Sequence, residues 1–390
     1  MKDGSSTTAT YTHPKEEAPV EVTPGDIVTY TLEIFNEGTV SGYANLIKDD
    51  IPEGLEFATY AKGDGSTNDI YRWKMVDEND NEVTDPAKAK YVMSDYLAKE
   101  NESKDGDNLI EAFDPENMDK PASKYVRVAF KVICKPDYPK IIKNEAQISD
   151  DTDADGKAVT DRDSTTNEWL GEDDEDVEFI KVIYFDLALR KWVTKAIVTV
   201  DGKTTVTETG HHAEDDPEEV VKVDLKKSKV DSVVVKFEYQ IRITNEGLIA
   251  GYADEVKDYI PEGLRFEQAD NPTWVQLSDN VVVTDELKNT LLQPGESAEV
   301  TIVLTWINSK TNMGVKTNIA EISKDRNDRG LHDIDSTPNN KVSGEDDIDD
   351  APVMLSIKTG SETTKYAVTI LAVLAILGLG VGLVKDFRKE

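Results

Sequence analysis

The chain has 390 residues, which suffices for two domains of ordinary size and a tail. It contains 44 Lys and Arg residues against 78 Asp and Glu residues, for a formal net charge of −34. This charge argues against a nucleic-acid partner, because carboxylates repel phosphates, and it favours counter-cations such as Ca2+. Cys134 is the single cysteine, so no disulfide forms within the chain.

The first residues, MKDGSSTTATYTHP, contain no apolar stretch of the kind found in a signal peptide. Features near the C-terminus, described below, nevertheless predict an exported protein. We therefore expect the sequence to be the C-terminal part of a longer chain.

Two segments of the chain are near copies of each other. Residues 34–57 (IFNEGTVSGYANLIKDDIPEGLEF) match residues 243–266 (ITNEGLIAGYADEVKDYIPEGLRF) at 15 of 24 positions. A spacing this long indicates duplicated domains rather than a solenoid of short repeats. Apolar and polar residues alternate before each copy, as along 233–243, which predicts antiparallel strands with one exposed face. Asn-Glu-Gly and Ile-Pro-Glu-Gly then predict turns.

Short alternating strands, regular turns and almost no helical periodicity predict an all-β chain of two tandem immunoglobulin-like β-sandwiches. We expect repeat 1 to span 1–176, without its first strand, and repeat 2 to span 177–352. Repeat 1 carries an insertion at about 58–124. A loop insertion is where a specific ligand would bind, although a loop without a ligand is the alternative.

The two copies share the pattern N-x-G, then D-x-x-P-x-G-L-x-F, then a late N-x-A strand. The first copy has Asn36, Gly38, Asp49, Pro52, Gly54, Leu55, Phe57, Asn144 and Ala146. The second copy has Asn245, Gly247, Asp258, Pro261, Gly263, Leu264, Phe266, Asn318 and Ala320. Over most of residues 20–350 the pattern resembles the bacterial surface repeat family called domain of unknown function eleven. The resemblance implies immunoglobulin-like sandwiches on the surface of a Gram-positive cell, commonly in serial arrays, and it implies no ligand.

An acidic loop in repeat 1 has the spacing of a cation site. Asp151, Asp153 and Asp155 alternate in D-x-D-x-D-G, and Asp161 and Asp163 lie within reach. Alternate carboxylates can converge on one hard cation, and the glycine permits a tight turn. The twelfth-position glutamate and the flanking helices of an EF-hand are missing. The sequence therefore predicts a Ca2+ loop of another kind at these five aspartates.

Other acidic segments are weaker indications of a cation. The loop 325–330 of repeat 2 matches 151–156 but has fewer carboxylates. Two acidic runs, 171–179 and 344–352, close the repeats. We interpret these runs as solvated connectors that could bind cations and stiffen the joints between domains.

The strand predicted over 185–193 places a lysine on its apolar face. Lys191 has the parity of Leu187 and Leu189, so its side chain points inward. A lone buried ammonium costs several kcal/mol. By the same parity rule, Asp258 and Asn318 also point inward from two other strands of repeat 2.

An inward Lys, Asp and Asn are the set needed for an isopeptide bond that the chain forms without an external substrate. A desolvated, neutral amine is a nucleophile, and a buried, protonated aspartate can relay protons while the asparagine loses ammonia. The order of the three residues resembles that in isopeptide-bonded adhesin domains of Gram-positive bacteria. The alternatives are that Asp258 and Asn318 only bond turn backbone, or that Lys191 reaches solvent or exchanges faces with Arg190. Repeat 1 has Asp49 and Asn144 but no first strand to supply a lysine.

The apolar run 366–384 predicts a transmembrane helix. The basic tail 385–390 follows it, so the positive-inside rule places the tail in the cytoplasm and the rest of the chain outside. Before the run, within 353–365, LSIKTG is similar to a sortase sorting signal, although the usual proline is missing. Cleavage at Thr359-Gly360 would join Thr359 to peptidoglycan. A plain transmembrane anchor is the alternative.

These features predict a non-enzymatic stalk or adhesin-type protein on the extracellular face of the cell envelope. Its expected partners are peptidoglycan or membrane through the C-terminus, and a surface ligand that the sequence does not identify. The alternative is a ligand-binding adhesin module that acts through the repeat 1 insertion. No nucleophile-elbow pattern, zinc motif or phosphate loop supports a hydrolase, and no small-molecule substrate is expected.

Overall fold

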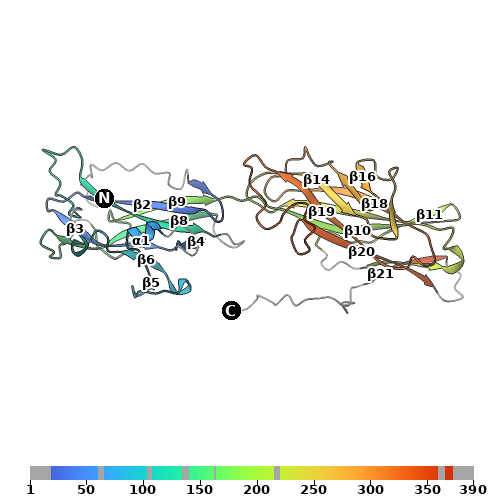
Figure 1. Ribbon diagram of the computed structural model, residues 1–390, viewed down its shortest axis with the longest axis horizontal. Helices are drawn as coiled ribbons and strands as arrows, with labels where there is room; N and C mark the ends of the chain where they lie inside the picture. The colour runs from blue at the N-terminus through green and yellow to red at the C-terminus, as the bar shows by residue number, and fades with distance from the viewer. Residues whose placement is uncertain are drawn as a thin grey trace. The chain divides into compact units, whose positions relative to one another are not determined.

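A computed structural model of the chain describes residues 19–59, 66–102, 108–133, 140–161, 164–214, 220–358 and 365–371. The chain divides into two compact units, Met1–Ile183 (unit 1) and Tyr184–Glu390 (unit 2). Both are built almost entirely from β-strands, as predicted (Figure 1). The boundary lies after the expected 176/177, because strand β9 (Glu175–Val182) pairs with β8 (Ile141–Asp153) of unit 1.

Unit 1 contains two sheets. The six-stranded sheet has the order β1 (Val20–Val22), β9, β8, β3 (Gly42–Asp50), β6 (Tyr91–Ser94) and β5 (Lys74–Val76). The three-stranded sheet has the order β2 (Ile27–Asn36), β7 (Ala122–Val132) and β4 (Leu55–Phe57). The short helices are α1 (Ser66–Ile70) and the 3-10 helices η1 (Pro86–Lys88) and η2 (Lys99–Asn101).

Unit 2 also contains two sheets. The five-stranded sheet has the order β11 (Lys203–Glu208), β10 (Leu187–Val200), β13 (Val234–Asn245), β18 (Ser297–Trp306) and β15 (Leu264–Phe266). The seven-stranded sheet has the order β16 (Trp274–Ser278), β17 (Val281–Thr284), β14 (Tyr252–Tyr259), β19 (Gly314–Arg326), β20 (Ile348–Lys358), β12 (Val220–Lys226) and β21 (Tyr366–Leu371). A 3-10 helix, η3 (Lys227–Lys229), follows β12.

The sheets of the two units correspond strand by strand. The order β1-β9-β8-β3-β6-β5 in unit 1 matches β12-β20-β19-β14-β17-β16 in unit 2, and β2-β7-β4 matches β13-β18-β15. Unit 2 adds β10 and β11 beside β13, and β21 beside β12. Among its described residues, unit 1 has no strand that corresponds to β10.

The Ile-Pro-Glu-Gly sequences form matching turns before β4 and β15. Leu55 N–H donates to the Pro52 carbonyl at 3.0 Å, and Leu264 N–H donates to that of Pro261 at 3.2 Å. The turn glycines have φ of +102° in unit 1 and +96° in unit 2, a region that side chains disfavour. The two turns therefore share their glycine because the backbone conformation at that position favours it.

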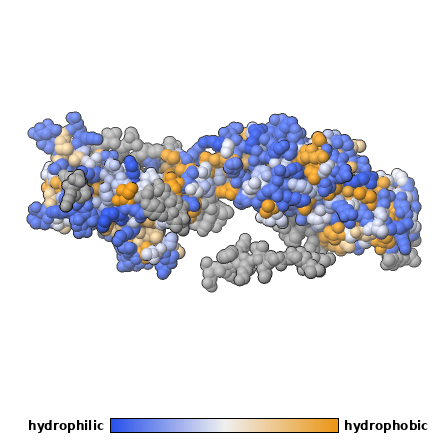
Figure 2. Space-filling model, viewed as in Figure 1, coloured by the Kyte–Doolittle hydropathy of each residue, from blue (hydrophilic) through white to orange (hydrophobic). Residues whose placement is uncertain are grey.

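The core of unit 2 lies between its two sheets. Along β13, residues alternate between fully buried and half-buried, and Phe237, Tyr239 and Ile241 have no exposed surface. They belong to one cluster with Val256 of β14 and Ile322 of β19, which are in the other sheet. Each such side chain contributes about 1.5 to 3 kcal/mol by burial. Hydrophilic residues cover most of the visible surface of each unit (Figure 2), as expected from the charge.

Part of the segment predicted as an insertion, 58–124, has a counterpart in unit 2. Strands β5 and β6 occupy the same places in unit 1 as β16 and β17 in unit 2. The added structure in unit 1 is therefore the short helices and the connections around them. Alternation along this segment is too brief to distinguish such edge strands from loops by sequence.

The predicted transmembrane helix over 366–384 is wrong at its start. Residues Tyr366–Leu371 form strand β21, which pairs antiparallel with β12 from Tyr366↔Leu225 to Leu371↔Val220. Tyr366 and Val368 pack against the core of unit 2, and the backbone completes the edge of β12. Within the described residues, no helix has the length and apolar character needed to span a bilayer. The rest of the run, and the tail 385–390, lie outside the described residues.

Candidate functional site

Lys191 lies inside unit 2. It is the fifth residue of β10, its neighbours in parity are Leu189 and Val193, and only 1% of its surface is exposed. Arg190, the next residue along the strand, is exposed. The alternation of the strand therefore turns the lysine into the core, and the two basic residues do not exchange faces.

The ammonium of Lys191 contacts a carboxylate of the opposite sheet. Lys191 Nζ lies 2.5 Å from Asp258 Oδ2 on β14, and neither side chain is exposed to solvent. Asn318 of β19 donates from Nδ2 to Asp258 Oδ1 at 2.7 Å and to the Tyr259 carbonyl at 3.1 Å. Asp258 pairs with Ala320 in the β14–β19 register, so Asn318 is its diagonal neighbour on the same face.

Lys191 Nζ has an aromatic neighbour in addition to Asp258. The Tyr239 ring centroid lies 5.0 Å from Lys191 Nζ, which adds a cation–π contact. Asn318 Oδ1 is buried and has no hydrogen-bond partner among the described residues. Buried polar atoms are rarely left unpaired, so an orphaned carbonyl oxygen at this position needs an explanation.

The arrangement places the three groups in a chemically useful order. One carboxylate oxygen of Asp258 contacts the amine, and the other contacts the amide nitrogen of Asn318. Asp258 can therefore accept a proton from the amine on one side and deliver a proton to the amide nitrogen on the other. The structure thus brings together the three residues that parity singled out, on β10, β14 and β19.

Unit 1 contains two thirds of the same site. Asn144 Nδ2 donates to Asp49 Oδ1 at 2.7 Å, and Asp49 is fully buried. Burial raises the pKa of Asp49 well above its usual range, although the Asn144 hydrogen bond opposes that shift. Asp49 Oδ2, the counterpart of the oxygen that contacts Lys191, has no partner among the described residues. In the described residues no lysine of unit 1 occupies this position.

The aspartates predicted as a Ca2+ loop do not converge, as far as the structure describes them. Asp151 and Asp153 lie on the last residues of β8, where Asp153 Oδ1 accepts a hydrogen bond from Lys157 N–H at 2.9 Å. Asp155 lies 3.4 Å from Lys157 Nζ. Asp161 contributes to the raised pKa of Asp151, whose main cause is burial. In this loop the described carboxylates form no group of three within metal-binding reach.

Some predicted residues cannot be placed. Asp163 and the sorting residues Thr359 and Gly360 lie outside the described residues. Lys358, the last residue described before them, ends β20. The sorting signal therefore remains a sequence-based prediction.

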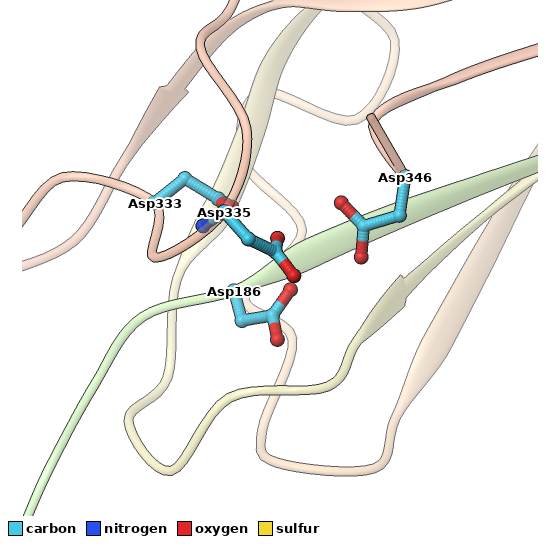
Figure 3. A group of neighbouring side chains, drawn as sticks. All are labelled: Asp186, Asp333, Asp335 and Asp346. Atoms are coloured by element: carbon cyan, nitrogen blue, oxygen red, sulfur yellow. The ribbon is translucent and has the colours of Figure 1, made fainter. Parts of the chain in front are cut away.

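A second group of carboxylates, which the sequence reasoning did not assemble, lies in unit 2. It consists of Asp186, Asp333, Asp335 and Asp346 (Figure 3). A repeated pattern could have revealed part of it: D-x-D-S-T-x-N occurs at 161–167 and again at 333–339. The interpretation of 344–352 as a solvated connector is inaccurate for Asp347, which is buried.

Comparisons with known proteins give distant similarities only. No family model matches the sequence, and no curated protein matches it. A solved structure described as "BspA_C_mut" aligns with 86% of this chain and 93% of its own at a TM-score of 0.30 and 10% identity. The collagen adhesin of S. aureus aligns with 90% of this chain and 92% of its own at a TM-score of 0.19 and 8% identity. The pilus backbone of Streptococcus pneumoniae aligns with 88% of this chain and 95% of its own at a TM-score of 0.19 and 11% identity. Scores this low carry no functional argument, so function must be argued from geometry.

Proposed function

We propose that this chain is a non-enzymatic stalk or adhesin segment of a bacterial surface protein, in which unit 2 is closed by an isopeptide bond between Lys191 and Asn318. The observation that carries the proposal is the contact of Lys191 and Asn318 with the two oxygens of one buried carboxylate, at 2.5 and 2.7 Å. An ordinary buried ion pair would not need the asparagine, and a hydrogen-bonded asparagine would not need the lysine.

The reaction needs no oxidant and no cofactor. Asp258 Oδ2 accepts a proton from the Lys191 ammonium, and the neutral amine attacks Cγ of Asn318. A bond forms between Nζ and Cγ, the bond between Cγ and Nδ2 breaks, and the nitrogen leaves as ammonia after protonation through Asp258. Exclusion of water strengthens each of these electrostatic contacts and protects the intermediate from hydrolysis.

The location of the three residues explains what the bond would contribute. β10 belongs to the five-stranded sheet and β19 to the seven-stranded sheet, so the product joins the two layers of unit 2 covalently. Disulfides serve that purpose in many extracellular domains, and this chain has one cysteine. A stalk built from such units keeps its fold outside the cell without disulfides.

Surface attachment is supported by the sequence rather than by the described structure. The LSIKTG segment with the apolar run and basic tail is similar to a sortase signal, and the paired repeats resemble a bacterial surface family. Attachment to peptidoglycan requires Thr359, whereas a plain membrane anchor requires only the apolar run.

The bond is tested by intact mass measurement of the denatured full chain. The expected mass is lower than the calculated mass by one ammonia, and the deficit disappears in Lys191→Met and in Asn318→Ala. Lys195→Met is the matched control, because Lys195 lies on the same strand but pairs at the surface with Glu238 at 2.6 Å. Tryptic digestion should give one branched peptide that contains both Lys191 and Asn318. An unshifted mass in folded, native protein rejects the bond.

Surface attachment is tested separately. The chain is expressed behind an export signal in a Gram-positive host, and intact cells are treated with a membrane-impermeant label. Labelling of the cell-bound chain, with release into the medium after deletion of 372–390, which keeps β20 and β21, is the expected result. Retention inside the cell, or unchanged attachment after the deletion, contradicts it.

A second candidate function is ligand binding by unit 1. A hollow of about 370 Å³ lies beside β5 and β6 of unit 1, and its lining includes Arg72, Lys74, Asp80, Glu82 and Asp95. Ion pairs already join Arg72 to Asp95 and Lys74 to Glu82. Replacement of Arg72 and Lys74 by alanine should abolish binding of the unidentified surface ligand if this hollow is the site, without changing the ammonia deficit.

A further inference from the structure

Four aspartates converge where the chain enters β10. The carboxylate oxygens that Asp186, Asp333, Asp335 and Asp346 offer all lie within 4.8 Å of one another. Figure 3 shows the carboxylates of Asp186 and Asp335 facing each other, with that of Asp346 directed toward them from the other side. The four residues come from three segments of the chain: the start of β10, the loop after β19, and the segment before β20.

Asp186 provides an independent indication of a ligand. Only 8% of its surface is exposed, and its Oδ1 has no hydrogen-bond partner among the described residues. Asp346 Oδ1 is also buried without a partner in this part of the structure. No Lys or Arg of the described residues forms an ion pair with any of the four aspartates. A buried, unpaired carboxylate costs free energy, so this geometry is expected only if something compensates it.

The backbone holds these carboxylates together. Leu187 N–H donates to Asp333 Oδ2 at 2.8 Å, and Ile334 N–H donates to the Phe185 carbonyl at 3.0 Å. Leu189 N–H donates to the Asp346 carbonyl at 2.7 Å. Strand β10 is therefore tied to both acidic segments by main-chain groups, and the carboxylates cannot separate without loss of these bonds.

Burial and the neighbouring carboxylates together raise the pKa of two of the four aspartates. Burial, followed by the charges of Asp346 and Asp333, raises the pKa of Asp186 to about 8. Burial, followed by Asp335 and Asp333, raises the pKa of Asp346 to about 7.

We propose that Asp186, Asp333, Asp335 and Asp346 bind a Ca2+ ion that fastens the start of β10 to the two acidic segments of unit 2. Ca2+ suits the site because every ligand offered is a carboxylate oxygen, and no His or Cys belongs to the group. Asp335 is exposed, which leaves room for water ligands. The site differs from the loop predicted at Asp151–Asp163 and does not depend on the isopeptide bond.

The unit 1 sequence contains part of the same set. Asp161 and Asp163 correspond to Asp333 and Asp335 in the shared D-x-D-S-T-x-N pattern, and Asp173 corresponds to Asp346 in the shared G-E-D-D sequence. The fourth ligand, Asp186, belongs to the β10 segment, which has no counterpart among the described residues of unit 1. The site is therefore complete in unit 2 only, as far as the chain is described.

Local hydrogen exchange of the full chain, with Ca2+ alone as the probe, tests this site. The protein is stripped of metal, and amide exchange is followed by mass spectrometry as Ca2+ is raised to about 10 mM, above the range of extracellular Ca2+ modules. Ca2+ should slow exchange at least tenfold in peptides that cover 186–190 and 332–348. Mg2+ at the same concentration should slow it less, because Mg2+ prefers a smaller, strictly octahedral site.

Three variants separate this site from general charge effects. Asp186→Asn and Asp335→Asn should abolish the Ca2+ effect in those peptides. Asp279→Asn, an identical substitution at an exposed turn of unit 2, should leave it unchanged. If Asp186→Asn fails to fold, the exposed Asp335 decides the matter. Exchange that ignores Ca2+ in the native chain, or slowing that persists in the folded Asp335→Asn variant, overturns the proposal.

Discussion

Lys191 Nζ and Asp258 Oδ2 lie 2.5 Å apart although the two residues belong to opposite sheets of unit 2. The contact crosses the core, where neighbouring residues such as Tyr239 have no exposed surface. Desolvation of a charged pair in this place costs free energy. Removal of only one partner costs more, because the other charge is left buried and unpaired.

The first prediction concerns stability. Lys191→Met leaves the carboxylate of Asp258 buried without its partner, which should lower the free energy of unfolding of unit 2 by about 3 to 5 kcal/mol. In chains that carry the bond, Lys191 is no longer an ammonium, and the variant instead loses a covalent closure across 127 residues, worth about 5 kcal/mol on the chain-entropy argument. Urea denaturation measures the change. Lys195→Met should cost at most about 1 kcal/mol, because its ion pair is partly exposed.

The double variant Lys191→Met/Asp258→Leu provides the complementary test. It removes both charges and should recover part of the stability lost in Lys191→Met, since a buried ion pair can be replaced by apolar groups at little cost. A double variant that is less stable than Lys191→Met alone would show that Asp258 has another partner in the core.

The second prediction compares the two asparagines. Asn318→Ala should remove the ammonia deficit from the intact mass of the full chain, whereas Asn144→Ala should leave it unchanged. The reason is that Asp49 Oδ2 has no lysine beside it among the described residues. A deficit of two ammonia in the native chain would mean that a lysine from elsewhere reaches unit 1.

The third prediction concerns pH. The folded-state pKa is raised to about 8 for Asp186 and to about 7 for Asp346 and Asp347, above the ordinary aspartate value. At pH values between the ordinary aspartate pKa and these raised values, the folded chain binds more protons than the unfolded chain. The free energy of unfolding must therefore fall as the pH rises. In chelator, unit 2 should have its urea midpoint lower at pH 8 than at pH 5.

Calcium should change that pH profile. If Ca2+ occupies the four-aspartate site, the decrease between pH 5 and pH 8 should shrink in saturating Ca2+, because protons and the ion compete for the same oxygens. Asp347 is outside the site, so a residual slope should remain. A profile that is the same in chelator and in Ca2+ contradicts the assigned ligands.

The fourth prediction concerns β21. Val368 pairs with Val223 of β12 and packs against the core. Val368→Pro removes a backbone donor and should raise the hydrogen-exchange rates of β12 amides, since proline is poorly accommodated in a paired strand. Thr369→Ala, at an exposed position of the same strand, should leave the rates unchanged. Equal exchange in both variants would mean that β21 does not protect β12 in solution.

Alternation predicted much of the fold and the centre of unit 2. Lys191, Asp258 and Asn318 each lie on a long strand, where every second side chain enters the core, so parity alone identified them. Asp186 was missed because it precedes β10, where the alternation of the strand does not decide direction. Asp333, Asp335 and Asp346 lie on loops, whose convergence depends on long-range pairing that a local pattern does not contain.

The error at 366–371 has a different cause. Hydropathy measures how strongly a segment favours an apolar environment over water. Both a bilayer and the open edge of β12 can provide a place for such a segment. The alternation of Tyr366 and Val368 against the core distinguishes the two, but it is hidden within an apolar run. Sequence therefore located the apolar segment without determining its environment.

Lys191 lies near the beginning of unit 2 and Asn318 near its end, and this has a mechanical consequence. A bond between them would carry a pulling force directly from β10 to β19. Force applied at Tyr184 would pass along the first residues of β10, through the bond to β19, and out through β20. The loop of chain between the two bonded residues would be spared the load. Shear flow could then stretch the tether without unravelling most of the domain.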